Sequence, residues 1–302
     1  MTHPSGQRPA RPSRGEPREV AELKALRARQ PELASAVDMH LELFQVQRRI
    51  QARLPLPWLD VSADIVARHQ AEARPLLRFD AIPLDLTELR LIVRQTTDVL
   101  RRAGALEPAD HARIQALGRD PALLTVVAAW YRRAAEQHTG RNAQAIAGAI
   151  PVTVPPHDPE EDGVLEQVLA VAMRPFLSRC AEVLQPRPEL ALWTHPFCAL
   201  CGGEPELAAI TPSAEWQLIC GRCTLRWKFA TLTCPFCLNG DRSRITSFAT
   251  PDGQYRVYAC DVCRRYLKAY DGRRASRPVM PIVDTVATLP LDAAAIQRGY
   301  SS

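Results

Sequence analysis

Apolar residues recur with a helical period in the first half of the chain. Leu33, Val37, Leu41 and Phe44 follow one another at intervals of four, four and three residues, so they share one face of a helix. The same spacing returns over residues 86–100, and the glycine at position 104 is suited to end that helix. The pattern predicts an all-α domain.

Two further helices are indicated by their first residues. Asp120 precedes Pro121, and Asp158 precedes Pro159, so each pair offers a capping side chain followed by a proline that fits the first helical turn. Pro175 lies inside the second of these helices. Because proline lacks the N–H that an inner helical position donates, we expect a kink or a break there.

After the Pro-rich linker at 185–190 the period changes from helical to alternating. Apolar residues alternate at 216–218 and at 225–229, and residues 243–259 contain two β-prone runs around a turn at Pro251-Asp252-Gly253. The C-terminal residues are partly helical in pattern and apolar enough to pack back on the body. The prediction is therefore an α+β protein, in which a helical domain precedes two small β-rich, zinc-ribbon-like metal units. The predicted segments are a disordered basic tail (1–19), the all-α domain (20–186), the two metal units (187–230 and 231–275) and a C-terminal tail that packs on the body (276–302).

Composition narrows the class of protein. The chain has 302 residues, of which 46% are hydrophobic and 24% charged, as in globular proteins. No apolar run approaches the roughly 18 residues that span a bilayer, and the N-terminal stretch has no apolar core of the kind that a secretory signal contains. We therefore expect a cytoplasmic protein without membrane insertion, whose thiols stay reduced and favour metal binding over disulfides.

Eight of the nine cysteines form four Cys-x-x-Cys pairs, a spacing that lets two sulfurs share one metal ion. They are Cys198 and Cys201, Cys220 and Cys223, Cys234 and Cys237, and Cys260 and Cys263. Eighteen residues separate the first two pairs and 22 the last two, near the usual spacing of four-cysteine zinc sites. We expect each pair to join its sequence neighbour in one site, with a cross-braced arrangement as the alternative.

Other roles for the thiols fit the pattern less well. Thioredoxin-like redox pairs open a helix after a strand, whereas these pairs lie between predicted strands. An iron–sulfur cluster stays an alternative, as does an enzyme that passes electrons or sulfur through the pairs. Cys180 falls on the apolar face of its helix, which favours a buried small hydrophobe. His195 is close enough to Cys198 to replace a ligand, but four cysteines already complete each site.

The charged and aromatic residues of the cysteine-rich region are consistent with a second function. The net charge is +5, and residues 198–277 carry 12 basic and 7 acidic side chains. Two divalent metals, each held by four thiolates, would lower the net charge of that region to about +1. Basic and aromatic residues on a sheet also bind single-stranded nucleic acid, so a zinc-ribbon nucleic-acid binder is the alternative function. No catalytic residue is assigned, because no nucleophile–base pair or phosphate-binding loop is present.

The C-terminal third resembles one family. The motifs "HPFCALCGGEPELAAI", "WQLICGRCTLRWKF", "TCPFCLNG", "YACDVCRRYLKAYD" and "DTVATLPLDAAAIQRGY" stand in the order seen in FdhE-type formate dehydrogenase accessory proteins. The helical part agrees only in length and class.

This resemblance implies a non-enzymatic maturation factor with two rubredoxin-like metal units. It implies a cytoplasmic protein that contacts the catalytic subunit of respiratory formate dehydrogenase, without nucleic acid as a partner. Iron in two four-cysteine sites is the implied cofactor, with zinc as the alternative metal. A homodimer is a further expectation that the sequence leaves undecided. Rubredoxin-like turns favour glycine directly after the second cysteine, where the backbone needs a positive φ. Of the four turns, only the first has this glycine, Gly202. Thr224, Leu238 and Arg264 occupy the corresponding positions of the other three turns.

Overall fold

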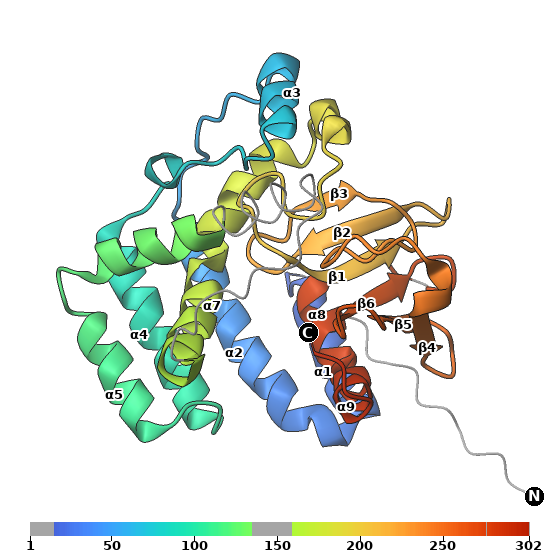
Figure 1. The fold of residues 1–302 in the computed structure, drawn as a ribbon. Helices are drawn as coiled ribbons and strands as arrows, with labels where there is room; N and C mark the ends of the chain where they lie inside the picture. The colour runs from blue at the N-terminus through green and yellow to red at the C-terminus, as the bar shows by residue number, and fades with distance from the viewer. Residues whose placement is uncertain (1–14, 135–158, 276, 302) are drawn as a thin grey trace, which may run out of the picture.

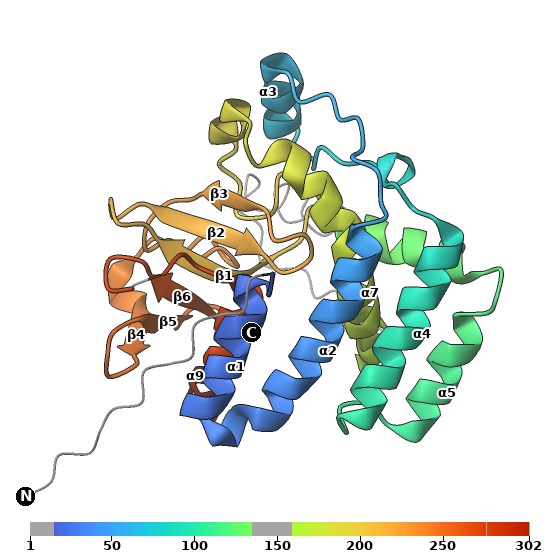
Figure 2. The same ribbon diagram turned by 180° about the vertical axis from the view of Figure 1, so that it is seen from behind.

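The computed structural model describes residues 15–134, 159–275 and 277–301, and helices form its N-terminal part (Figures 1 and 2). The helices are α1 (Arg18–Arg29), α2 (Ala34–Gln51), α3 (Ala63–Ala71), α4 (Leu86–Arg102), α5 (Pro108–Leu117) and α7 (Pro159–Leu184), with a further helical stretch at 123–134 and 3-10 turns at Pro31–Leu33, Phe79–Ala81 and Pro188–Leu192. Helix α1 already includes residues 18 and 19, which the sequence assigned to the tail, while residues 1–14 lie outside the described ranges. No helix in the described ranges has both the length and the hydropathy needed to cross a bilayer.

The predicted apolar faces are buried in part, since Leu41 and Phe44 are half-buried and Leu86 is exposed. Val37 on α2 and Leu89 and Val93 on α4 are fully buried. The Asp85 carboxylate accepts the Glu88 N–H at 2.9 Å and so caps α4. Gly104 follows the end of this helix with a φ of 71°, as its predicted role requires.

Helix α7 continues through Pro175 instead of ending there. Proline cannot donate to the carbonyl four residues earlier, which belongs to Val171. The side-chain amide of Gln47, on α2, donates to that carbonyl at 2.9 Å. A neighbouring helix therefore supplies the hydrogen bond that the proline removes, so α7 remains one helix. The predicted cap of α7, Asp158, lies outside the described residues.

The C-terminal part contains one six-stranded sheet. Its strands are β1 (Pro205–Ile210), β2 (Trp216–Cys220), β3 (Arg226–Lys228), β4 (Ile245–Ala249), β5 (Tyr255–Cys260) and β6 (Tyr266–Asp271), in the order β3-β2-β1-β6-β5-β4. Neighbouring strands are antiparallel except β1 and β6, which pair in parallel from Leu207 and Lys268 to Ile210 and Asp271. The predicted hairpin is present as β4 and β5, with Gly253 in its turn. The sequence treated 187–230 and 231–275 as separate metal units, whereas the β1–β6 pair joins their strands in one sheet.

Both faces of this sheet are covered. On one face Leu218, Trp227 and Leu267 share the core of the helical domain. On the other face Tyr255 and Val257 pack against the C-terminal helices α8 (Pro281–Ala287) and α9 (Leu289–Gln297). Helix α8 also packs on α1 and α2, so the C-terminal segment lies between the helical domain and the sheet (Figure 1).

Candidate metal centres

The four Cys-x-x-Cys turns have the same backbone geometry. In each turn the N–H of the first cysteine donates to the carbonyl five residues later, over 2.8 to 3.0 Å. The residue after the second cysteine donates its N–H back to the carbonyl of the first cysteine, over 2.9 to 3.1 Å. These two bonds close each turn and bring its two sulfurs to one side.

The residue that follows the second cysteine has a positive φ in all four turns. Its φ is 70° at Gly202, 63° at Thr224, 62° at Leu238 and 60° at Arg264. Only glycine adopts this region without strain. The three positions that lack glycine therefore keep the rubredoxin-like backbone geometry, and the substitution does not abolish the turn.

The eight sulfurs gather in two groups, each made of sequence-neighbouring pairs. The groups are cluster 1 (Cys198, Cys201, Cys220 and Cys223) and cluster 2 (Cys234, Cys237, Cys260 and Cys263). Within each cluster the sulfurs all lie within 4.8 Å of one another. The described residues thus show the sequential arrangement and not the cross-brace.

Sulfur–sulfur distances fit one tetrahedral ion in each cluster. The separation is 3.4 Å between Cys198 and Cys223 and 3.5 Å between Cys201 and Cys220. The corresponding pairs of cluster 2 lie 3.7 and 3.6 Å apart. Metal–sulfur bonds of about 2.3 Å in a tetrahedron place the sulfurs about 3.8 Å apart, whereas a disulfide needs about 2.05 Å. Four thiolates around one point suit both zinc and iron, and metal ligation by these residues stays a prediction.

Burial and hydrogen bonding shift the thiol pKa values in opposite directions. In cluster 1, burial raises the pKa of Cys198 and of Cys223 well above the usual range. Burial also opposes ionisation of Cys220, but hydrogen bonds from the other three thiols hold its pKa well below the usual range. Clustered thiols therefore share their protons unevenly, and a divalent ion favours the deprotonated form of all four.

Cluster 2 shows the same division nearer the surface. The hydrogen bond from Cys234 lowers the pKa of Cys263 to about 5, and the same contact raises the pKa of Cys234. Partial burial raises the pKa of Cys237 to about 11. At neutral pH Cys263 is thus mainly thiolate, whereas Cys234 and Cys237 are mainly protonated.

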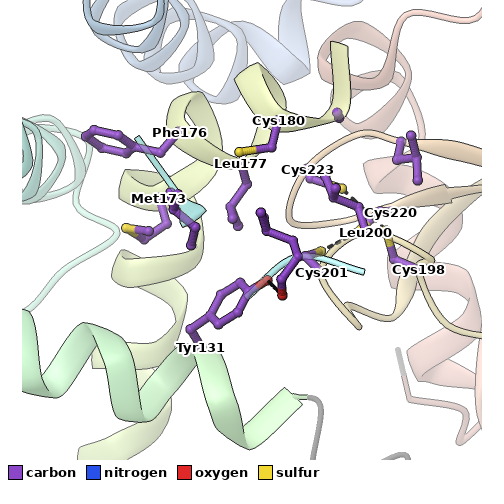
Figure 3. Packing of buried hydrophobic residues seen from close by; sticks show 14 of the residues in the cluster. Tyr131, Met173, Phe176, Leu177, Cys180, Cys198, Leu200, Cys201, Cys220 and Cys223 are labelled. Carbon is purple, nitrogen blue, oxygen red and sulfur yellow. Dashed lines mark hydrogen bonds between the residues drawn. The ribbon is translucent and has the colours of Figure 1, made fainter. Parts of the chain in front are cut away.

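The two clusters differ in their surroundings. All four cysteines of cluster 1 are at most 1% exposed, and they belong to the core shared with α7. Figure 3 shows Leu177 and Leu200 between α7 and this cluster. In cluster 2, Cys234 and Cys260 are buried, but Cys237 and Cys263 reach the surface. Cluster 1 is therefore an interior site, and cluster 2 is a surface site.

Residues of the helical domain hold the turns of cluster 1 by hydrogen bonds. The backbone N–H groups of Leu76 and Leu77 donate to Ala199 and Leu200 at 2.8 and 2.9 Å. Tyr131 donates its hydroxyl to the Leu77 carbonyl at 2.9 Å. Sequence reasoning missed these contacts, because main-chain bonds between distant segments leave no local pattern.

A second set of contacts comes from α7. The Arg174 guanidinium donates to the Gly221 carbonyl at 2.7 Å, and Ser178 donates to the Cys223 carbonyl at 3.3 Å. Cluster 1 is thus fixed to the helical domain from two sides.

The ninth cysteine, Cys180, and the histidine considered as a ligand, His195, lie outside the clusters. Cys180 is fully buried on α7, and burial raises its pKa to about 12, as expected for a small hydrophobe. The His195 ring stacks on Phe197 and its Nε2 atom lies 2.7 Å from the Gln70 carbonyl. Neither belongs to a four-residue metal group among the described residues.

Most of the large aromatic residues near the clusters are packed inside the protein, while Phe229, Phe236 and Tyr258 are half-buried. Trp193, Trp216, Trp227 and Tyr255 are all less than 9% exposed. Stacking of nucleobases needs exposed rings, so this packing disfavours the nucleic-acid alternative.

Comparison with known proteins finds one FdhE relative by sequence and one FdhE protein by structure. No family model matches the chain. A relative named "Protein FdhE homolog", from Aquifex aeolicus (strain VF5), is 25% identical over 144 residues, which are 46% of this chain and 50% of the relative. The match thus spans half the length of that relative. The crystal structure of the FdhE protein from Pseudomonas aeruginosa matches with a TM-score of 0.55 and 18% identity, over 94% of this chain and 91% of that one. The resemblance to FdhE-type proteins and the α+β fold class are thereby confirmed.

Proposed function

We propose that this protein is an accessory factor in the maturation of a respiratory formate dehydrogenase. It binds the catalytic subunit of that enzyme in the cytoplasm. Each cysteine cluster carries one metal ion, with iron as the proposed metal and zinc as the alternative. The observation that carries the proposal is the pair of four-sulfur clusters on a fold similar to that of an FdhE protein.

The donor sets favour a role other than catalysis. A catalytic metal needs a position open to water or substrate, whereas four thiolates close a tetrahedral site. The eight cysteines would hold the two ions and fix the turns around them. The metals are then structural or redox-sensitive parts of a surface that binds a client protein.

Metal content tests the cofactor. The protein purified without oxygen should contain two equivalents of metal per chain, and the absorption spectrum distinguishes ferric thiolate from zinc. Replacing Cys201 or Cys260 by serine should remove one equivalent each, while Cys180→Ala should retain both. A wild-type preparation that binds no metal under these conditions would contradict the proposal.

Client binding tests the partner. The tagged chain should co-purify with the formate dehydrogenase catalytic subunit from cytoplasmic extract, and cells without the protein should lose formate dehydrogenase activity. Complementation by Cys180→Ala with failure by Cys201→Ser would link the activity to the clusters. Normal enzyme activity in the deleted cells would exclude the maturation role.

A further inference from the structure

A cleft of about 270 Å³ lies where the helical domain, the cluster 1 turns and the C-terminal segment meet. Its walls come from α1, α2, α7, β3 and the start of α8. We propose that this cleft binds an organic oxyanion, a molecule with a phosphate or carboxylate group and an apolar part, through Arg48, Arg174 and Arg226. The proposal does not depend on the proposed function.

Three guanidinium groups line the cleft. Among the described residues Arg174 pairs with Glu206 at 3.4 Å, the charge of Asp284 acts on Arg226, and Arg48 forms no ion pair. Arg48 is exposed, and its guanidinium carbon lies 5.6 Å from the centroid of the Phe44 ring. Arg226 donates to the Val279 carbonyl at 3.2 Å, and burial lowers its pKa. Planar guanidinium groups match phosphate and carboxylate oxygens, so such groups without an acid partner favour an external anion.

Arg174 contributes a donor that the protein leaves unused. Its terminal nitrogen bonds the Gly221 carbonyl and lies 3.4 Å from Glu206, but its Nε atom is buried without a hydrogen-bond partner. A buried donor without a partner is unfavourable. Because this Nε atom is shielded from solvent, an oxyanion in the cleft would contact Arg174 through its terminal nitrogens.

The remaining lining adds selectivity. Phe44, Pro175, Pro281 and Ile282 provide an apolar wall, which favours a ligand with a hydrocarbon or ring portion over a bare inorganic ion. Glu19 is the one carboxylate among the lining residues. Because Glu206 already pairs with Arg174, the excess positive charge of the lining comes from Arg48 and Arg226 against Glu19, and this excess favours an anion.

The cleft also adjoins cluster 1. Its lining includes Thr224, which follows Cys223, and Ser178, which bonds the Cys223 carbonyl. A ligand here would contact both the helical domain and a cluster 1 turn. Binding would therefore stabilise the junction between the two parts.

Calorimetric titration of the metal-loaded full chain tests the site with phenyl phosphate, benzoate and inorganic phosphate at constant ionic strength. We expect saturable 1:1 binding of phenyl phosphate or benzoate, with the tighter of the two identifying the anionic group, and weaker binding of inorganic phosphate. Arg48→Gln should reduce the affinity about tenfold or more, since it removes a charge-assisted hydrogen bond. Glu19→Gln should increase it, because it removes the opposing carboxylate.

The matched control is Arg49→Gln. Arg49 is the next residue on α2, is exposed and lines a different groove, so its replacement removes the same charge outside the cleft and should leave the affinity unchanged. The proposal is overturned if neither organic anion saturates, or if Arg49→Gln weakens binding as much as Arg48→Gln. Arg48 is exposed on a stable helix, and unchanged thermal unfolding of each variant shows that lost binding does not reflect lost fold.

Discussion

Thr224, Leu238 and Arg264 hold a backbone conformation that their side chains disfavour. Each has a φ near 60°, and for residues other than glycine this region is unfavourable by roughly 1–2 kcal/mol. The conformation persists because each residue donates its N–H to the first cysteine of its turn. The strain is therefore a consequence of closing the turn around a four-cysteine cluster.

Leu238→Gly should stabilise the metal-loaded protein. Leu238 is 46% exposed, so little packing is lost, while glycine adopts its φ of 62° without strain. We expect a gain of about 0.5–1 kcal/mol in the free energy of unfolding, measured by denaturant titration.

Arg264→Gly is the informative comparison, because Arg264 has tertiary contacts. Its guanidinium donates to the Arg298 carbonyl at 2.8 Å and lies 4.1 Å from the Tyr300 ring centroid. Loss of these contacts should cancel the relief of strain. Destabilisation by Leu238→Gly would show that the positive φ carries no strain at this position.

Alkylation should distinguish the thiols of cluster 2 after the metal is removed. The pKa of Cys263 is lowered to about 5 and that of Cys237 is raised to about 11, so at pH 7 Cys263 is mainly thiolate, the reactive form, and Cys237 is mainly thiol. Iodoacetamide followed by peptide mass spectrometry should find Cys263 modified first. Faster modification of Cys237, which is also at the surface, would contradict the inferred charge distribution.

At this scale the sequence predicted most of the candidate site. The Cys-x-x-Cys spacing is local information, and it correctly indicated two groups of four sulfurs. The supporting contacts of Leu76, Tyr131 and Arg174 could not be predicted, because they depend on how remote segments dock.

The continuity of α7 depends on one side chain from another helix. Gln47→Leu should leave the Val171 carbonyl without the hydrogen bond that it accepts at 2.9 Å and destabilise the protein by about 1–3 kcal/mol. Adding Pro175→Ala should restore much of this loss, because alanine at position 175 supplies the missing N–H. Thermal unfolding of the single and double variants measures this coupling.

Gln45→Leu serves as the control for this cycle. Gln45 lies on the same helix but is exposed, so its replacement should change stability by less than about 0.5 kcal/mol. Equal effects of Pro175→Ala with and without Gln47 would mean that the two residues act independently.

Sequence patterns predicted the hairpin of β4 and β5 but neither β1 nor β6. Strand β1, Pro205–Ile210, begins with proline and contains two alanines, residues that strands disfavour. Strand β6 carries Lys268 and Asp271, which are buried because they pair with Asp292 and Arg273. Such pairing hides the alternation that indicates a strand, so the joining of the two metal units could not be predicted.

On the scale of the whole molecule, the two clusters should lose metal by different routes. Cluster 2 has two cysteines at the surface, whereas cluster 1 lies in the shared core. A chelator should therefore remove the metal of cluster 2 through local opening. The metal of cluster 1 should leave at least about tenfold more slowly, because its release requires larger-scale unfolding. Absorbance or a metal indicator records the two phases.

Cys237→Ser should abolish the fast phase and leave the slow one. Cys180→Ala, which removes a sulfur outside both clusters, should keep both phases. A single phase that releases both equivalents together would show that the clusters open as one unit.

The parallel pair of β1 and β6 also bears on how the chain is made. The ribosome completes β1 about 60 residues before β6, its parallel partner, which at roughly 5–20 residues per second corresponds to roughly 3–12 s. During that interval the edge of β1 that later pairs with β6 has no partner. Its unpaired backbone N–H and C=O groups are a template for pairing with other nascent chains. Expression yield should thus depend on translation speed through residues 211–265, and separating the chain at position 230 would make the transient exposed edge permanent.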